Sequence, residues 1–96
     1  MATYIVLWNW TDEGIRTVKK SPERVEAFKK LVEKAGGKVE AFYYTIGEYD
    51  GAARVEVPSD EAWMKVALGL GMLGNVRTKS LKAWSAAEGA KVIAQL

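Results

Sequence analysis

The hydrophobic positions of the chain recur with two periods, one typical of strands and the other of helices. Segments rich in β-branched and aromatic residues predict strands over residues 3–10, 38–46, 51–57 and 76–84. Apolar residues spaced three and four positions apart predict helical segments over residues 12–20, 21–35, 60–73 and 86–96. The first strand is apolar on both of its faces, as expected of a central strand that is covered on both sides.

Helix boundaries are marked by capping residues. Thr11, Ser59 and Ser85 each precede a helical pattern and are suited to accept hydrogen bonds from its first free N–H groups. Glu88 completes a capping box with Ser85. Ser21 stands before a proline that suits the first turn, and it is predicted to cap the longest helix in the same way.

The order of these elements is strand, helix, strand, strand, helix, strand, followed by a terminal helix. Short connections and right-handed crossovers fold this order into an α+β, ferredoxin-like βαββαβ sandwich. We therefore expect one domain over residues 1–96, with a four-stranded antiparallel sheet, both long helices on one face and a short C-terminal helix. The other face of the sheet has no cover within one copy of the chain.

The residues expected on that uncovered face follow from the alternation of each strand. The apolar positions Ala53, Val55 and Val57 should face the helices, which turns Arg54 and Glu56 outward. Pairing and alternation add the following residues: Glu40, Phe42, Tyr44, Ile46, Ser80, Lys82 and Trp84, together with Trp8 and Trp10, or else Ile5 and Leu7, from the first strand. An aromatic patch of this size favours coverage by a second copy, and hence a homo-oligomer.

The charged residues of this face have two interpretations. In the first, Glu56 forms a cross-strand ion pair with Lys82 or Arg54 inside a subunit interface. In the second, two sheets enclose a cavity where Glu40 or Glu56 is a desolvated base, Arg54 holds an anionic oxygen and Tyr44 donates a hydrogen bond. The second interpretation describes a cofactor-free monooxygenase or a proton-transfer enzyme.

The four tryptophans either fill the core and an interface or line a ligand pocket. Two small residues in the middle of a strand, Ala52 and Ala53, leave space that an indole ring or a ligand must occupy. If a pocket is present, we expect it to bind a small, largely apolar or aromatic molecule. Its candidate ligand-binding residues are Trp8, Trp10, Phe42, Tyr44, Arg54 and Trp84.

The amino-acid composition excludes several kinds of catalytic and metal-binding site. The chain has no Cys and no His, which removes structural zinc sites of the usual kind, thiol catalysis and the Ser-His-Asp triad. We expect no metal and no cofactor. A net charge of +2 in 96 residues predicts neither nucleic acid nor membrane as a partner. The N-terminal segment has no basic region followed by an apolar run, and we expect a cytoplasmic protein.

Three local patterns resemble one known family. They are residues 10–14 (Trp-Thr-Asp-Glu-Gly), residues 47–50 (Gly-Glu-Tyr-Asp) and residues 73–78 (Leu-Gly-Asn-Val-Arg-Thr). In order and spacing they resemble the GYD domain family, small bacterial and archaeal proteins of unassigned function. The resemblance implies similarity to dimeric α+β barrel proteins, some of which are cofactor-independent monooxygenases or small-molecule binders. It also implies that Tyr49 and Asp50 are signature loop residues and Arg77 a signature cation.

The chain departs from the family pattern at two places. Gly51-Ala52-Ala53-Arg54 replaces bulky aliphatic residues, and Trp84 stands where a phenylalanine is usual. Ala, Met, Leu and Trp also accumulate between Trp63 and Met72. A third interpretation is therefore an engineered scaffold, with a remodelled pocket or with an assembly interface that includes Trp63 and Met72.

Overall fold

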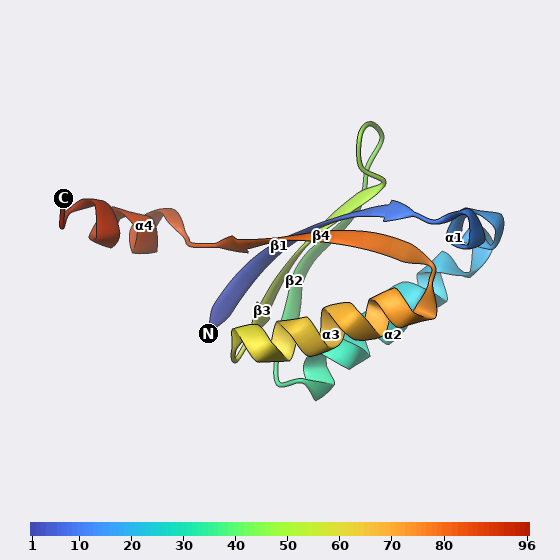
Figure 1. Ribbon diagram of the computed structural model, residues 1–96, viewed down its shortest axis with the longest axis horizontal. Helices are drawn as coiled ribbons and strands as arrows, with labels where there is room; N and C mark the ends of the chain where they lie inside the picture. Colours follow the sequence, from blue (N-terminus) through green and yellow to red (C-terminus); the bar gives the residue numbers. More distant parts are fainter.

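The computed structural model describes residues 1–96 as a βαββαβ unit followed by a projecting helix (Figure 1). The strands are β1 (Ala2–Trp10), β2 (Lys38–Tyr44), β3 (Gly51–Val57) and β4 (Val76–Ala83). The helices are α1 (Asp12–Arg16), the 3-10 turn η1 (Val18–Lys20), α2 (Ser21–Lys34), α3 (Asp60–Leu73) and α4 (Ala86–Ile93). The predicted order of elements and the α+β class are confirmed.

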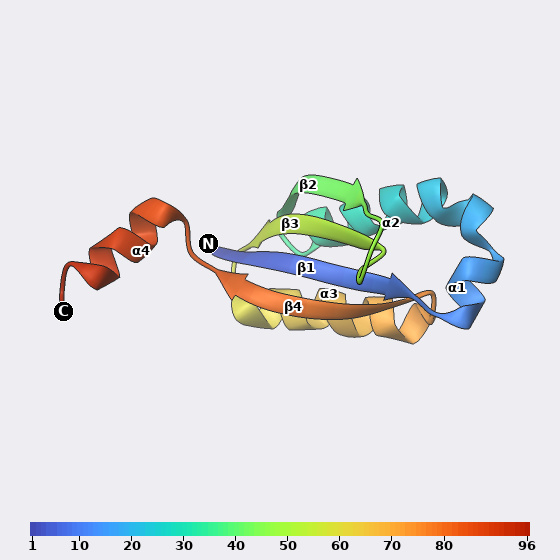
Figure 2. The same cartoon turned by 90° about the horizontal axis from the view of Figure 1, so that it is seen from above.

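The four strands form one antiparallel sheet in the order β2-β3-β1-β4. Helices α2 and α3 both lie on one face of this sheet, and Figure 2 looks onto the opposite face, which carries no helix. Helix α4 extends beyond the end of β4, away from the sheet (Figure 1). The molecule is therefore long and flat, with extents of 49 × 30 × 18 Å.

Three of the four predicted N-caps are confirmed. Thr11 accepts from the Gly14 N–H, Ser59 accepts from the Ala62 N–H, and Ser85 forms its capping box with Glu88. The prediction for Ser21 is wrong. Ser21 is the first residue of α2, is 5% exposed, and shares a hydrogen bond of 2.8 Å with the Tyr44 hydroxyl.

The core lies between the sheet and the two long helices. Ala53, Val55 and Val57 of β3 are at most 4% exposed and face the helices, as predicted. They pack with Val6 of β1, Phe28 and Val32 of α2, and Trp63 and Val66 of α3. Burial of these side chains, each about 1.5–3 kcal/mol for the larger ones, holds α2 and α3 on this face.

A bulge in β2 places two aromatic residues on the face of the sheet opposite to the one predicted. Val39 is opposite Val55 and Ala41 is opposite Arg54, so Glu40 is an extra residue in β2. Beyond this point the alternation is reversed, and Phe42 and Tyr44 lie on the helix-covered face. The prediction that they lie on the uncovered face is wrong, because it assumed a regular strand.

The residues of β4 that were predicted on the uncovered face also lie on the other side of the sheet. Ser80 is opposite Val6 and Lys82 is opposite Tyr4, which places both on the helix-covered side of the sheet. Each finds a polar partner on or beside α3: Ser80 accepts from the Trp63 indole N–H at 2.8 Å, and Lys82 binds Asp60. These partners let polar side chains occupy a face that hydrophobicity alone assigns to Leu81 and Ala83.

For β1, the second of the two predicted alternatives holds. Val6 and Trp8 are 2% and 5% exposed and face the helices, together with Trp10. Ile5 and Leu7 therefore lie on the uncovered face, where Leu81, opposite Ile5, is 52% exposed.

Candidate functional site

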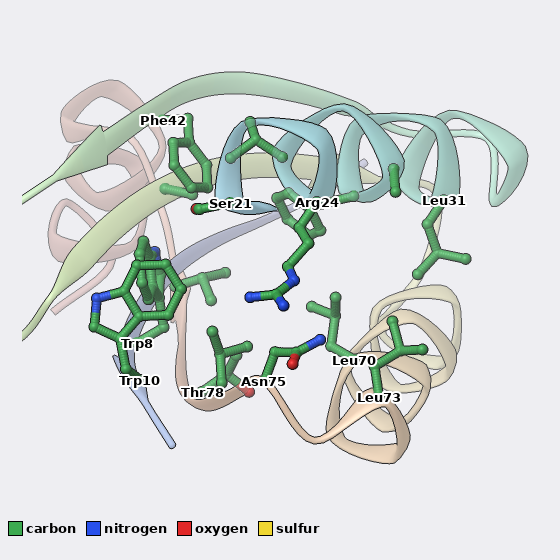
Figure 3. Close-up of a pocket in the computed structure, with 16 residues that line it drawn as sticks. Trp8, Trp10, Ser21, Arg24, Leu31, Phe42, Leu70, Leu73, Asn75 and Thr78 are labelled. Atoms are coloured by element: carbon green, nitrogen blue, oxygen red, sulfur yellow. The ribbon is translucent and has the colours of Figure 1, made fainter. Parts of the chain in front are cut away.

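An apolar cavity of about 220 Å³ opens between the sheet, α2 and α3 (Figure 3). It lies near the end of the sheet where β1 ends and β4 begins. Twelve of its 16 lining residues are hydrophobic. Three of the predicted ligand-binding residues, Trp8, Trp10 and Phe42, line it. This cavity lies on the helix-covered side of the sheet, whereas the ligand pocket was predicted on the uncovered side.

Trp8 is the central aromatic residue of this cavity. Its ring meets Trp10 edge-on at 4.9 Å between centroids and stacks with Phe42 at 5.8 Å. Gly51, opposite Trp8 in the sheet, makes room for the indole, because a Cβ at Gly51 would lie 1.9 Å from the indole ring. The indole N–H of Trp8 is buried without a hydrogen-bond partner. The rings form a rigid wall on one side of the cavity.

Asp50 anchors the end of β1 that carries these rings. Its carboxylate accepts from the Trp10 backbone N–H at 2.9 Å and from the Asn9 amide at 3.4 Å. The Asp50 N–H donates to the Trp8 carbonyl at 2.9 Å. These hydrogen bonds fix the end of β1 against the loop that contains Asp50.

The junction after β1 is joined to the turn before β4. Thr11 donates through its N–H to the Asn75 carbonyl at 3.2 Å and through its hydroxyl to the Gly74 carbonyl at 2.6 Å. Gly14 is buried against the same turn, and a Cβ there would lie 1.9 Å from the Asn75 carbonyl oxygen. These contacts place Asn75 at the cavity.

Arg24 of α2 is the charged residue of the cavity, and it is not among the site residues predicted from the sequence. It is half-buried and donates to the Gly14 carbonyl at 3.4 Å and to the Thr17 hydroxyl. The available signal was its position, four residues before Phe28 on a helix whose inward face is apolar apart from Ser21.

The remaining predicted residues of the uncovered face surround a shallow groove. Glu40, Arg54, Glu56 and Trp84 line it, together with Thr3, Ile5, Ala83, Ser85 and Glu88. Tyr44 lies on the other side of the sheet, so the predicted catalytic set of Glu40, Glu56, Arg54 and Tyr44 is not brought together. Glu56 accepts a hydrogen bond of 3.1 Å from the Thr3 hydroxyl.

Glu56 forms an ion pair with neither Lys82 nor Arg54, so both alternatives of the predicted cross-strand pair are wrong. Lys82 instead binds Asp60 at 2.8 Å, and Tyr4 donates to the same carboxylate at 2.8 Å. Hydrogen bonds from Lys82 and Tyr4 lower the pKa of Asp60, while the bond to Asp60 raises the pKa of Lys82 and that of Tyr4. The Lys82 ammonium also lies 5.7 Å from the centre of the Trp84 ring. This cluster holds the start of α3 against β4.

Two other predicted residues lie at the surface near the cavity end of the sheet. The Tyr49 ring lies 5.4 Å from the Lys79 ammonium, and Tyr49 accepts from the Thr45 hydroxyl through its carbonyl at 2.6 Å. Arg77 is exposed on the uncovered face, opposite Asn9. Neither lines the cavity.

The two residues of the expected assembly interface, Trp63 and Met72, differ in burial. Trp63 is 3% exposed and belongs to the core, so it is not part of a surface. It stacks on Tyr4 at 5.6 Å between ring centroids. Met72 is 88% exposed near the end of α3.

No helix of the chain combines the length and the apolar character needed to cross a membrane.

The three sequence patterns described above converge in space. Asp50 from the second pattern holds Trp10 of the first, and Thr11 of the first holds the turn at Gly74 and Asn75 of the third. The model of the GYD domain family matches residues 4–93. The chain belongs to the GYD domain family. The three sequence patterns therefore lie around one end of the sheet, beside the cavity.

The GYD chain is also similar to individual known proteins. It is 36% identical over 84 residues to the glutamine synthetase and cystathionine beta-lyase binding protein of Thermus thermophilus, covering 86% of this chain and 88% of that protein. The crystal structure of the Thermus thermophilus protein TTHA0845 superposes with a TM-score of 0.56 at 26% identity, covering 90% of this chain and 96% of that one.

A leucine response regulatory protein of Mycobacterium tuberculosis, LrpA, shares the fold of this GYD domain. The TM-score is 0.65 at 24% identity, and the match covers 88% of this chain and 51% of that one. This likeness supports the ferredoxin-like arrangement of the sheet and helices and nothing more specific.

Proposed function

We propose that this GYD protein is a small homo-oligomeric binding protein that holds a small, largely apolar molecule in the cavity between its sheet and helices. The observation that carries the proposal is the cavity of about 220 Å³, with 12 hydrophobic residues among the 16 that line it. Concave, mostly apolar pockets with a few polar groups are the usual form of small-molecule sites.

The size of the cavity limits the ligand. An apolar cavity of about 150 Å³ is sufficient to bind benzene. The 220 Å³ of this cavity therefore accommodates one aromatic ring, or a branched aliphatic group, with a short substituent. The stacked rings of Trp8 and Phe42 favour a flat or apolar body beside them.

Self-association is supported by the side of the sheet that carries no helix (Figure 2). Leu81 is 52% exposed and Tyr43 is 63% exposed on that face, and Trp84 at its edge is 62% exposed. The projecting helix α4 adds Val92 and Ile93, which are 59% and 66% exposed. A second copy of the chain, placed against this face and against α4, removes this apolar surface from water.

Native mass spectrometry of the purified protein at several concentrations tests both parts of the proposal. We expect a discrete oligomer, some of which carries the additional mass of a small molecule. Leu81→Glu should shift the population toward the monomer, whereas Leu68→Glu, at a position 63% exposed on α3, should not. A monomer at every concentration would overturn the self-association part.

A second candidate function is attachment to a metabolic enzyme. It is favoured by the 36% identity to a Thermus thermophilus protein named for binding glutamine synthetase and cystathionine beta-lyase. The test uses purified glutamine synthetase and cystathionine beta-lyase from the source of this chain, with analytical ultracentrifugation of each mixture. Co-sedimentation with either enzyme is expected, and independent sedimentation in both mixtures rules this candidate out.

A further inference from the structure

We infer that Arg24 makes the cavity selective for a carboxylate, so that its ligand has an aromatic or branched apolar body and one carboxylate end. The inference rests on the proposed binding function, because it concerns the same cavity. It adds the chemical class of the ligand.

The first argument is the missing counter-charge of Arg24. The salt bridges of the chain join Lys29 to Glu26 and Lys82 to Asp60, and Arg24 has no carboxylate within 4.0 Å. Its two hydrogen bonds go to neutral acceptors, the Gly14 carbonyl and the Thr17 hydroxyl. A guanidinium offers five N–H donors, so several stay available at a half-buried position where water competes less than in bulk solvent.

The second argument is the direction of the side chain. In Figure 3 the guanidinium of Arg24 points into the space between the tryptophans on one side and Asn75 and Leu70 on the other. No acidic residue lines the cavity, and the polar residues besides Arg24 are Ser21, Asn75 and Thr78, which are neutral. The cavity therefore combines apolar walls with one positive charge.

The third argument concerns the choice of anion. A single arginine matches the two oxygens of a carboxylate in a bidentate pair. A phosphate dianion carries more charge and three acceptor oxygens, and it is usually held by several cations or by backbone N–H groups at a helix N-terminus. One guanidinium beside the neutral amide of Asn75 and the neutral hydroxyl of Thr78 fits the carboxylate.

Isothermal titration calorimetry with three probes of similar size tests the inference. The probes are 3-phenylpropanoate, its neutral amide 3-phenylpropanamide, and phenyl phosphate. We expect 3-phenylpropanoate to bind at least about tenfold more tightly than the amide, since hydrogen bonds between charged groups are about twice as strong as neutral ones. Tighter binding of phenyl phosphate than of 3-phenylpropanoate would overturn the assignment to carboxylates.

Variants then assign the effect to Arg24. Arg24→Gln should weaken binding of 3-phenylpropanoate about tenfold and remove the preference over the amide, whereas Arg24→Lys should retain part of that preference. Arg16→Gln is the control, because Arg16 is exposed on α1 and does not line the cavity. Thr78→Phe should abolish binding of both probes by filling the cavity. A melting temperature for each variant shows that it is folded before it is titrated.

The outcomes separate this inference from the proposed function. Equal binding of the acid and the amide to the unmodified protein refutes selection by Arg24 and leaves the binding function in place. If Arg24→Gln still prefers 3-phenylpropanoate over the amide to the same degree, selection by Arg24 is likewise refuted and the binding function stays in place. Failure of both the acid and the amide to bind overturns the proposed small-molecule function itself.

Discussion

Replacing Gly14 by alanine tests whether the contact between α1 and the turn before β4 holds the cavity end of the sheet together. The new Cβ would lie 1.9 Å from the Asn75 carbonyl oxygen, 2.8 Å from its carbon and 3.2 Å from its Cα. All three are backbone atoms, so no flexible side chain is able to move aside. The helix or the turn must shift, and the two hydrogen bonds that Thr11 makes to Gly74 and Asn75 are the first to be lost.

The expected loss of stability for Gly14→Ala follows from these contacts. Overpacking costs about 1–3 kcal/mol, and each lost hydrogen bond contributes about 0.5–1.5 kcal/mol. Alanine recovers about 1 kcal/mol of helix propensity. We therefore expect a net loss of about 3 kcal/mol, and a fall in the melting temperature of about 12–24 °C for a domain of this size.

Differential scanning calorimetry measures this difference, and Gly71→Ala is the matched control. Gly71 lies in α3, and a Cβ built there has no heavy atom within 4 Å. The same substitution should therefore leave the melting temperature unchanged or raise it by a few degrees. An equal rise for Gly14→Ala and Gly71→Ala would refute the close approach of α1 to the Asn75 carbonyl.

Three further outcomes follow from the contacts described above. Trp8→Ala should lower the free energy of unfolding by about 3–5 kcal/mol, measured by urea denaturation, because Trp8 is 5% exposed and packed among aromatic rings. Asp60→Asn should flatten the acid side of a stability–pH profile. The folded-state pKa of Asp60 is lowered by Lys82 and Tyr4, so the stabilisation from its carboxylate is present above its ordinary pKa of about 4 and is lost as pH falls below that value. Ser85→Ala should reduce helical circular dichroism without changing the melting temperature of the sheet, because the capping box stabilises only the projecting helix α4.

The order of elements could be predicted from the sequence because each boundary carries a local signal. Thr11, Ser59 and Ser85 cap helices within three residues of themselves, and the burial of β3 follows its own alternation. Local signals failed at Ser21, where the hydroxyl of Tyr44, 23 residues away in sequence, competes for the serine oxygen.

The location of the candidate site could be predicted only in part, because it depends on contacts between distant segments. The aromatic character of Trp8, Trp10 and Phe42 predicts that they line a pocket, but the cavity they line is on the helix-covered side of the sheet and not on the predicted side. For Phe42 the wrong side follows from the bulge at Glu40, which no residue in β2 signals. For Trp8 and Trp10 the alternation of β1 leaves both sides open, because that strand is apolar on both faces. Arg24 was missed because a lone arginine on a helix is usually a solvated charge.

The extra residue in β2 has a consequence for how this sheet tolerates mutation. Before Glu40, at Val39, the odd-numbered position of β2 faces the helices, whereas after Glu40 the even-numbered positions do so. Phe42 therefore reaches the cavity only because β2 contains this one extra residue. No single substitution exchanges the two sides of such a strand, but deletion of one residue does so at once. Length variation in this segment of GYD relatives is therefore expected to alter the cavity wall more than amino-acid replacement at any one of its positions.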